Sequence, residues 1–252
     1  MRWVYRGRLG VSIALSMTNS LAAVHLAARM AIAVGGGVLA SSAMISADEI
    51  RPSGTNTYQK VTGDGAEEDR KHWDKLYSSR NYIFGKEPAR FIEEHIDLLP
   101  PGRGLDLAMG EGRNAVYLAK KGFQVDGVDI SEVALKKAKR LARENRVSIH
   151  TLSADLASYL INPESYTVIL NIDYLQRNLI PQIKRGLRKK GVVVFENLTE
   201  DQLKNAGGKN LRRDALLRKG ELREFFKDFE ILVYREVNDG KFAKASLIAR
   251  KP

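Results

Sequence analysis

The residues best suited to chemistry lie in a twelve-residue stretch, Gly104–Ala115, with the sequence GLDLAMGEGRNA. Gly110 and Gly112 follow an apolar run that contains Asp106. Alternate glycines let backbone N–H groups approach a ligand, and a helix that starts there points its positive end at the same place. A charge inside a buried strand is costly unless a partner or ligand meets it. The stretch therefore predicts a strand, a glycine turn and a helix around a small charged or polar cofactor.

The remainder of the folded part alternates between short apolar runs and helical patterns. We expect strands at 104–108, 124–128, 147–152, 166–171 and 192–196. We expect helices at 113–121, 132–145, 178–187 and 220–227, and a turn at 189–191. Runs at 229–236 and 244–250 around Asn238-Asp239-Gly240 predict an antiparallel hairpin. The pattern predicts a Rossmann-like, doubly wound α/β fold: a mostly parallel seven-stranded sheet that ends in this hairpin, with helices on both faces.

Residues 1–47 differ in composition from the rest of the chain. They carry four arginines and no acidic residue, and the apolar run 30–45 ends at Ile45-Ser46-Ala47, an acceptable cleavage site. This run suits a signal-peptide core but is short for a membrane-spanning helix. Three interpretations stay open: an export signal or membrane anchor, an organellar transit peptide, and a start codon placed too far upstream. Residues 48–69 are polar and predict a flexible linker before a domain at 70–252.

The composition restricts the chemistry further. There is no cysteine, which excludes disulfides, thiolate metal ligands and a cysteine nucleophile. The four histidines lack metal-binding spacing, so no metal site is expected. The net charge of +11 favours anionic partners, although solubility alone also explains it.

Several blocks of residues follow one another in a characteristic order. They are Trp73-Asp74 with Tyr77, Tyr82–Pro88, Leu105–Asn114, Val128–Ser131, Ala154–Leu156, Tyr174–Arg177 and Leu217–Leu222. Together they resemble the class I S-adenosylmethionine-dependent methyltransferases, and within them the tellurite-resistance and thiopurine-type small-molecule group. The resemblance covers about residues 70–252. It implies an enzyme with S-adenosyl-L-methionine as its cofactor.

The resemblance implies a role for each residue of the glycine motif. Gly110 and Gly112 would bring the backbone against the methionine part of the cofactor. Asp106 would order this turn and reach the cofactor's ammonium. Ala108 and Asn114 lie within the same motif and are expected to contact the cofactor as well.

The nucleoside part of the cofactor is assigned to the next two strand ends. Asp129, twenty-three residues after Asp106, stands where a carboxylate accepts both ribose hydroxyls. Ile130 would pack on the adenine, and Asp155 would accept from its amino group, with Ala154 and Leu156 alongside. Taken alone, Asp129 is equally well explained as a helix cap. Asp155 has a weaker alternative explanation as a turn residue.

The methyl acceptor is expected at the end of the fourth strand. Asn171 and Tyr174 would border the place where the methyl is presented, Tyr174 and Arg177 are the catalytic candidates, and Tyr82 is expected at the cofactor. Basic residues at the mouth would attract an anion: Arg80, Lys86, Arg113 and Arg177. Arg177 is also explained as a solvated helix charge, and the aromatics Trp73, Tyr77, Tyr82 and Phe84 as core.

The chain departs from the family at Ala108-Met109, where a Gly-Cys pair is usual. The Ala108 methyl is tolerable if the backbone there is not at positive φ. The flexible thioether of Met109 is expected to crowd the methionine end of the cofactor and lower its affinity.

The resemblance implies methyl transfer by direct displacement to a small anionic or soft acceptor: a thiol or a selenium or tellurium oxyanion. Alternatives are RNA or protein methylation, suggested by the basic helix with Lys136 and Arg140, an NAD-dependent oxidoreductase, and a cofactor-binding relic without activity. Salt-sensitive RNA binding would favour the first. We expect a monomer or homodimer that faces the cytoplasm, where the cofactor is made, and contacts a membrane only through residues 1–47.

Overall fold

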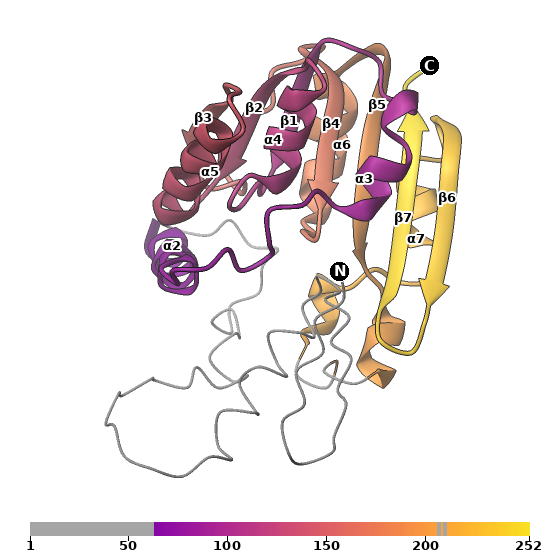
Figure 1. The fold of residues 1–252 in the computed structure, drawn as a ribbon. Helices are drawn as coiled ribbons and strands as arrows, with labels where there is room; N and C mark the ends of the chain where they lie inside the picture. Colours follow the sequence, from indigo (N-terminus) through magenta and orange to yellow (C-terminus); the bar gives the residue numbers. More distant parts are fainter. Residues whose placement is uncertain (1–62, 206–207, 209–210) are drawn as a thin grey trace, which may run out of the picture. The chain divides into compact units, whose positions relative to one another are not determined.

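The computed structural model describes residues 63–205, 208 and 211–252, which form a seven-stranded sheet with helices on both faces (Figure 1). The strand order is β3-β2-β1-β4-β5-β7-β6. The first five strands run parallel, and β7 runs antiparallel to both of its neighbours, β5 and β6. The predicted Rossmann-like α/β fold is confirmed.

The strands lie close to their predicted positions. They are β1 (Arg103–Leu107), β2 (Gln124–Asp129), β3 (His150–Ser153), β4 (Tyr166–Ile172), β5 (Leu187–Leu198), β6 (Glu230–Asn238) and β7 (Ala243–Arg250). β5 begins five residues earlier than expected, because the predicted turn at 189–191 is a bulge inside it. Its partners on β4 show this: Leu187 pairs with Tyr166, and Val192 with Val168.

The helices confirm the predicted alternation of strands and helices, but the first helix begins within the predicted linker. They are α2 (Gly63–Tyr77), α3 (Arg90–Glu94), α4 (Arg113–Lys120), α5 (Glu132–Glu144), α6 (Ile180–Gly186) and α7 (Glu221–Phe225), with 3-10 turns at Ile96–Leu98, Arg177–Leu179, Glu200–Lys204 and Arg213–Ala215. The prediction of a flexible linker through residue 69 is wrong for residues 63–69, which are helical. Residues 1–47 and 48–62 lie outside the described part. None of the helices within 63–205 and 211–252 is long and apolar enough to cross a bilayer.

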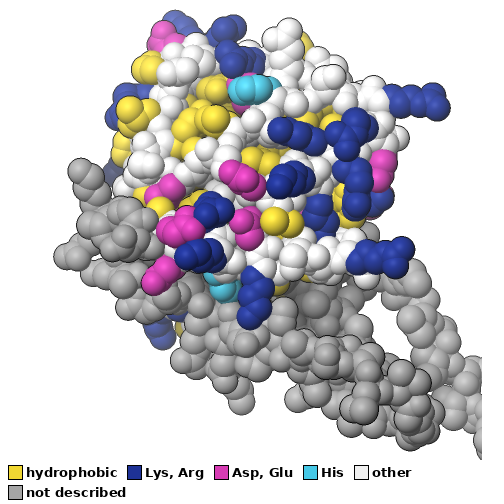
Figure 2. All heavy atoms as spheres, turned by 90° about the vertical axis from the view of Figure 1, so that its left-hand side faces the viewer, with side chains coloured by type: hydrophobic (Ala, Val, Ile, Leu, Met, Phe, Trp, Pro, Cys, Tyr) yellow, Lys and Arg dark blue, Asp and Glu magenta, His cyan; other side chains and the backbone are white. Residues whose placement is uncertain are grey.

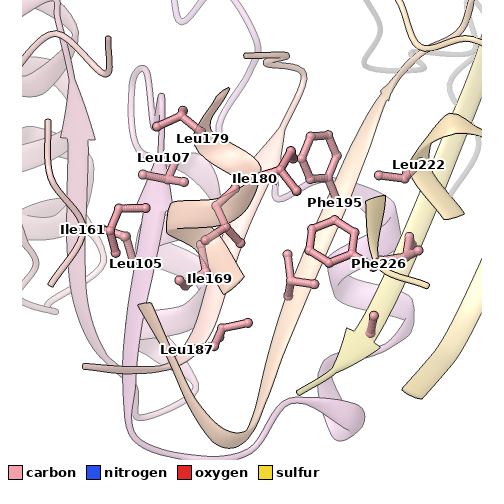
Figure 3. Packing of buried hydrophobic residues seen from close by; sticks show 14 of the residues in the cluster. Leu105, Leu107, Ile161, Ile169, Leu179, Ile180, Leu187, Phe195, Leu222 and Phe226 are labelled. Carbon is pink, nitrogen blue, oxygen red and sulfur yellow. The ribbon is translucent and has the colours of Figure 1, made fainter. Parts of the chain in front are cut away.

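The sheet separates two apolar layers, because successive strand residues point to opposite faces. On β5, Val193 and Phe195 join the layer under α6 and α7, whereas Val192 and Val194 join the layer that also contains residues of α3, α4 and α5. Figure 3 shows Phe195 beside Phe226, the residue directly after α7; their ring centroids are 6.3 Å apart. Helices cover the apolar layer on each face of the sheet, so the ends of the strands are the place for a ligand site.

Helix α5 is amphipathic, as its sequence predicts. Ser131 caps it by accepting a hydrogen bond from the Ala134 amide at 3.1 Å. Its apolar side is buried against the sheet, and four basic side chains are exposed: Lys136, Lys139, Arg140 and Arg143. Figure 2 shows Lys and Arg side chains grouped on this part of the molecule. Lys137 is the exception, since it is buried.

The C-terminal hairpin is confirmed, including its turn. Asp239 accepts hydrogen bonds from the Lys241 and Phe242 amides at 2.8 and 2.6 Å, and Gly240 has a φ of 82°. β7 lies between β5 and β6, so the later strand of the hairpin is the inner one. This order places Lys244 next to Glu196 of β5, near the carboxyl ends of the parallel strands.

Candidate active site

A pocket lies at the carboxyl ends of the parallel strands, where ligands of open α/β sheets gather. Its lining is Asp69, Trp73, Tyr77, Phe84, Gly85, Ala108, Met109, Gly110, Glu111, Arg113, Asn114, Asp129, Ile130, Ala154, Asp155, Leu156, Ile172, Asp173 and Tyr174. The structure therefore brings together nine predicted residues: Ala108, Gly110, Asn114, Asp129, Ile130, Ala154, Asp155, Leu156 and Tyr174. Five others do not line the pocket: Tyr82, Asp106, Gly112, Asn171 and Arg177.

The glycine turn is clamped to the end of β2. The Gly110 amide donates to Asp129 Oδ2 at 2.7 Å, and the Met109 amide donates to the Val128 carbonyl at 3.0 Å. Gly110 has a φ of 54°, and a Cβ added to it would lie 2.9 Å from the Tyr77 hydroxyl. Glycine is therefore required here by both conformation and space.

Asp129 is more than a helix cap, because Ser131 performs that function. Its second oxygen, Oδ1, accepts from the Ser131 amide at 2.8 Å, and the side chain is buried at the pocket wall. Burial raises the pKa of Asp129, while the Ser131 and Gly110 amides act in the opposite direction. Each carboxylate oxygen keeps capacity for a further donor. The residue can accept hydrogen bonds from a ligand's hydroxyl groups.

The far end of the pocket combines an apolar wall with one carboxylate. Ile130, Ala154 and Leu156 supply the apolar surface, as predicted for an adenine site. Asp155 stands beside them and also accepts from the Ala157 amide at 2.8 Å. The turn interpretation of Asp155 is therefore correct, and it leaves room for the predicted adenine contact because each oxygen can accept more than one hydrogen bond.

Sequence reasoning left open whether the aromatics were core or site, and the structure divides them. Trp73, Tyr77 and Phe84 line the pocket. Trp73 and Tyr77 are stacked with centroids 5.8 Å apart, and Tyr77 lies 6.3 Å from Phe84. The i, i+4 spacing of Trp73 and Tyr77 was the available signal. Asp69 was missed because it fell within the predicted linker.

Three residues predicted at the cofactor serve the surrounding structure instead. The Tyr82 hydroxyl donates to the Lys137 carbonyl at 3.2 Å, away from the pocket. Gly112 lets α4 approach α5, since a Cβ there would lie 2.7 Å from that of Ala138. Asn171 donates from Nδ2 to the Tyr174 carbonyl and so holds the turn that carries Tyr174.

Asp106 lies beneath the glycine turn, fully buried on β1. Burial raises the pKa of its carboxyl to about 7, although Arg113 and the Ala115 amide lower it. Within the part of the chain that the structure describes, its Oδ2 has no hydrogen-bond partner. A buried acceptor without a donor favours a donor from a ligand or solvent at this point.

Arg177, predicted to be catalytic, is a structural clamp. Its guanidinium donates to both carboxylate oxygens of Glu221 at 2.7 and 2.8 Å, and to the carbonyls of Asp214 and Leu216 at 2.7 and 2.9 Å. It therefore ties the turn after β4 to the segment before α7. The alternative of a solvated helix charge is wrong too.

We expect Arg177→Met to remove an acid-sensitive part of the fold's stability. Burial alone would raise the pKa of Glu221, but hydrogen bonds from Arg177 and Arg218 lower it from 4.5 to about 2. A depressed folded-state pKa gives stability that is present above the unfolded value and is lost as the pH falls toward about 2. Urea unfolding at neutral pH should show a loss of about 3 kcal/mol.

The control for this prediction is Arg185→Met, since Arg185 is exposed on α6. It should change stability little and leave the acid dependence as in the wild type. An Arg177→Met chain with full stability but no methyl transfer would show that Arg177 is catalytic after all.

The residue before the turn is strained. Ala108 has a φ of 51°, the left-handed region, so the condition under which its methyl is tolerable is not met. We expect Ala108→Gly to raise the free energy of unfolding by about 0.5 to 1 kcal/mol, because relief of strain outweighs the added chain entropy. Ala119→Gly in α4 is the matched control and should lower it by about 1 kcal/mol. Equal destabilisation by both changes would contradict the prediction.

The side chain of Met109 does not project as expected. A Cβ built on Gly127 of β2 would lie 1.9 Å from its sulfur, so the thioether occupies the space above that glycine. The side chain is buried in the layer that contains α4 and α5 residues. Crowding of the cofactor by the thioether is therefore not supported, because Met109 fills a gap in the core.

Charges alternate along the Arg113 side of the pocket. Arg113 pairs with Asp173 at 3.1 Å, Lys244 pairs with the same carboxylate at 3.0 Å, and Lys244 also pairs with Glu196 at 2.9 Å. The prediction that four basic residues lie at the mouth of the pocket is wrong for three of them, because only Arg113 lines the pocket. Lys86 pairs with Glu144 on the surface instead. The described residues contain no cluster suited to a metal ion.

Comparison with known proteins agrees with this geometry. The chain is 26% identical over 164 residues to a protein of Haemophilus influenzae described as a probable S-adenosyl-L-methionine-dependent methyltransferase TehB, covering 58% of this chain and 52% of that protein. It spans about half the length of the curated relatives it matches first. The crystal structure of TehB from H. influenzae superposes with a TM-score of 0.56 and 21% identity, covering 73% of this chain and 67% of that one.

A second solved structure has the same fold. Geranyl diphosphate C-methyltransferase from Streptomyces coelicolor, in complex with S-adenosyl-L-homocysteine, superposes with a TM-score of 0.58 and 13% identity, covering 80% of this chain and all of that one. The class I methyltransferase fold predicted from the sequence is thereby confirmed. Residues 73–246 match the family model described as tellurite resistance protein TehB, and the chain belongs to that family of S-adenosylmethionine-dependent methyltransferases.

Proposed function

We propose that the chain binds S-adenosyl-L-methionine in the pocket and transfers its methyl group to a small soft or anionic acceptor. The single observation that carries the proposal is the buried carboxylate of Asp129, bonded to the Gly110 amide at the carboxyl ends of β1 and β2. This arrangement joins a ribose acceptor to a glycine turn that admits a ligand to the backbone.

The residues present fit this cofactor. The lining has five acidic side chains (Asp69, Glu111, Asp129, Asp155 and Asp173) against Arg113. Lys137 compensates Glu111, and Arg113 and Lys244 compensate Asp173, so the negative charge of the lining comes from Asp69, Asp129 and Asp155. Such a lining favours a ligand with a net positive charge, as a sulfonium and an ammonium provide. Asp106 does not line the pocket, but its buried Oδ2 has no hydrogen-bond partner among the described residues and suits the ammonium through a water. The apolar surface of Ile130, Ala154 and Leu156 suits a base.

When bound, the cofactor supplies a methyl group on an already activated sulfonium. The chain's own residues then have to orient the acceptor and exclude water. The acceptor end of the pocket has an apolar wall, formed by Tyr174, Phe84 and Ile172, and Arg113 is the basic residue there. A deprotonated acceptor with an exposed lone pair, such as a thiolate or a selenium or tellurium oxyanion, needs no general base. This agrees with Asp173, whose carboxylate is engaged by both Arg113 and Lys244.

The proposal is tested in two steps. Calorimetry with S-adenosyl-L-homocysteine measures binding, and methyl-labelled S-adenosyl-L-methionine measures transfer to thiols, selenite, tellurite and bulk RNA in parallel. We expect binding and transfer to at least one soft acceptor. No binding at saturating ligand would overturn the proposal. Binding with transfer only to RNA would favour the alternative acceptor, and binding without any turnover would identify a relic.

A further inference from the structure

Lys137 is a buried lysine on α5, whose other basic side chains are all exposed. Its ammonium donates hydrogen bonds to the backbone carbonyls of Tyr77, Ser79 and Asn81 at 3.2, 2.9 and 2.7 Å. It also forms an ion pair with Glu111. Three N–H donors thus face three carbonyls and a carboxylate, so the donor capacity of the ammonium is fully used.

Glu111 continues this contact on the other side. It is the residue between the two glycines of the turn, it is buried, and it lines the pocket. Its Oε2 accepts from the amides of Ile83 and Phe84 at 2.7 and 3.5 Å. The pair therefore binds backbone groups on both halves of the stretch from 77 to 84.

These polar contacts matter because the segment that they hold has few buried side chains of its own. We call residues 78–89 the aromatic segment; it supplies Phe84 and Gly85 to the pocket. Within 78–88 no residue is buried. Its far end is held by the Ala89 amide, which donates to Asn114 Oδ1 at 2.8 Å. A segment with few buried apolar contacts opens easily unless polar contacts restrain it.

We infer that Lys137 is a positioning residue that orders the aromatic segment over the pocket and so sets the affinity for the cofactor, although it does not line the pocket. The part of the inference that concerns cofactor affinity rests on the proposed function. Without the ammonium, three carbonyls face one another, and the buried Glu111 charge has no counterion. Movement of the segment away from α5 relieves both, and it takes Phe84 and Gly85 out of the pocket wall.

The first test is Lys137→Ala, with Lys139→Ala as the matched control. Lys139 belongs to the same helix and is exposed, so its loss removes the same charge without touching the segment. Hydrogen–deuterium exchange should quicken about tenfold in peptides from 78–89 of Lys137→Ala and stay unchanged in those from β4 and β5. Affinity for S-adenosyl-L-homocysteine should fall about tenfold in Lys137→Ala alone.

Chemical rescue separates a positioning role from simple packing. Lys137→Ala removes three methylenes and an ammonium, so n-propylammonium supplies the missing atoms with its three N–H donors. Added n-propylammonium should restore slow exchange in 78–89 and recover affinity. Tetramethylammonium, which has the charge but no donor, should do neither. If Lys137→Ala does not fold, Lys137→Met, which keeps the stem as far as the position of Cε and removes the ammonium, takes its place in the exchange and affinity measurements, without the rescue.

The outcomes are distinct. Unchanged exchange in 78–89 of the variant would overturn the inference, and faster exchange with unchanged affinity would overturn its second half. A wild-type chain that binds no S-adenosyl-L-homocysteine refutes the proposed function instead, while the exchange measurement still decides whether Lys137 orders the segment.

Discussion

Asp129→Asn is expected to lower the affinity for S-adenosyl-L-homocysteine by about 100-fold to 1,000-fold. The carboxylate has two tasks that an amide cannot combine: Oδ2 accepts from the Gly110 amide and Oδ1 from the Ser131 amide. An amide nitrogen in place of either oxygen presents a donor to a donor. The change therefore removes a charged acceptor for the ligand and loosens the glycine turn together. Calorimetry measures the affinity.

Asp126→Asn is the control for this prediction. Asp126 belongs to the same strand but faces Arg103, at 2.8 Å, outside the pocket. Its loss should leave the affinity unchanged. The wild type should also bind more weakly as the pH is lowered through the raised pKa of Asp129, because protonation removes the charged acceptor. Full affinity in Asp129→Asn would remove the basis of the proposed ribose site.

Gly110→Ala should lower the affinity for S-adenosyl-L-homocysteine at least about a hundredfold, while the variant still folds. The new Cβ would lie 2.9 Å from the Tyr77 hydroxyl, and the backbone φ of 54° is strained for alanine. Since Tyr77 is buried in the pocket wall, the contact is relieved only by moving the wall or the turn. Fluorescence titration with S-adenosyl-L-homocysteine gives the affinity, and urea unfolding gives the stability.

Gly122→Ala separates strain from occlusion. Gly122 also has a positive φ, 91°, but no atom lies within 4 Å of its added Cβ. It should cost about 1 to 2 kcal/mol of stability and leave affinity unchanged. Tyr77→Phe in the Gly110→Ala background should recover part of the affinity, since the next nearest ring atom is 3.5 Å away. Equal losses of affinity in Gly110→Ala and Gly122→Ala would show that backbone strain, and not contact with Tyr77, lowers the affinity.

The part of the site that the sequence predicts well is the part that the strands position. Residues at the carboxyl ends of β1 and β2 meet because parallel strands end at one edge, and the family resemblance places Gly110, Asp129 and Ile130 at these ends. Asp155 follows β3 in the same way. Local pattern was sufficient there because backbone geometry carries these side chains to the pocket.

Residues whose partners are distant in sequence were misassigned. Arg177 has the residue type and place of a catalytic group, but Glu221 lies forty-four residues away, and nothing local marks the pair. Lys137 follows another lysine in a basic helix, and only the three-dimensional contact with residues 77–81 distinguishes it from Lys136. Spacing predicts which face of a helix is buried, but not which charged side chain finds a buried counterion there.

Backbone strain was also beyond the sequence. Alanine at 108 predicts an ordinary conformation, whereas the turn imposes a positive φ on it. A propensity argument assigns each residue its own preference, but the geometry here is determined by the clamp between the Gly110 amide and Asp129. The family's usual glycine at this position was the available signal.

The inner position of β7 has a consequence for the order of folding. β6 and β7 meet across a short turn, so their hairpin closes a small loop and can form early. Its docking on β5 brings together residues far apart in the chain, such as Val192 and Arg250, which is a slow, non-local step. Until that step, β5 has an unpaired edge that can join the strand of another chain. Variants that weaken the turn at Gly240 should therefore aggregate during refolding before they lose stability in the native state.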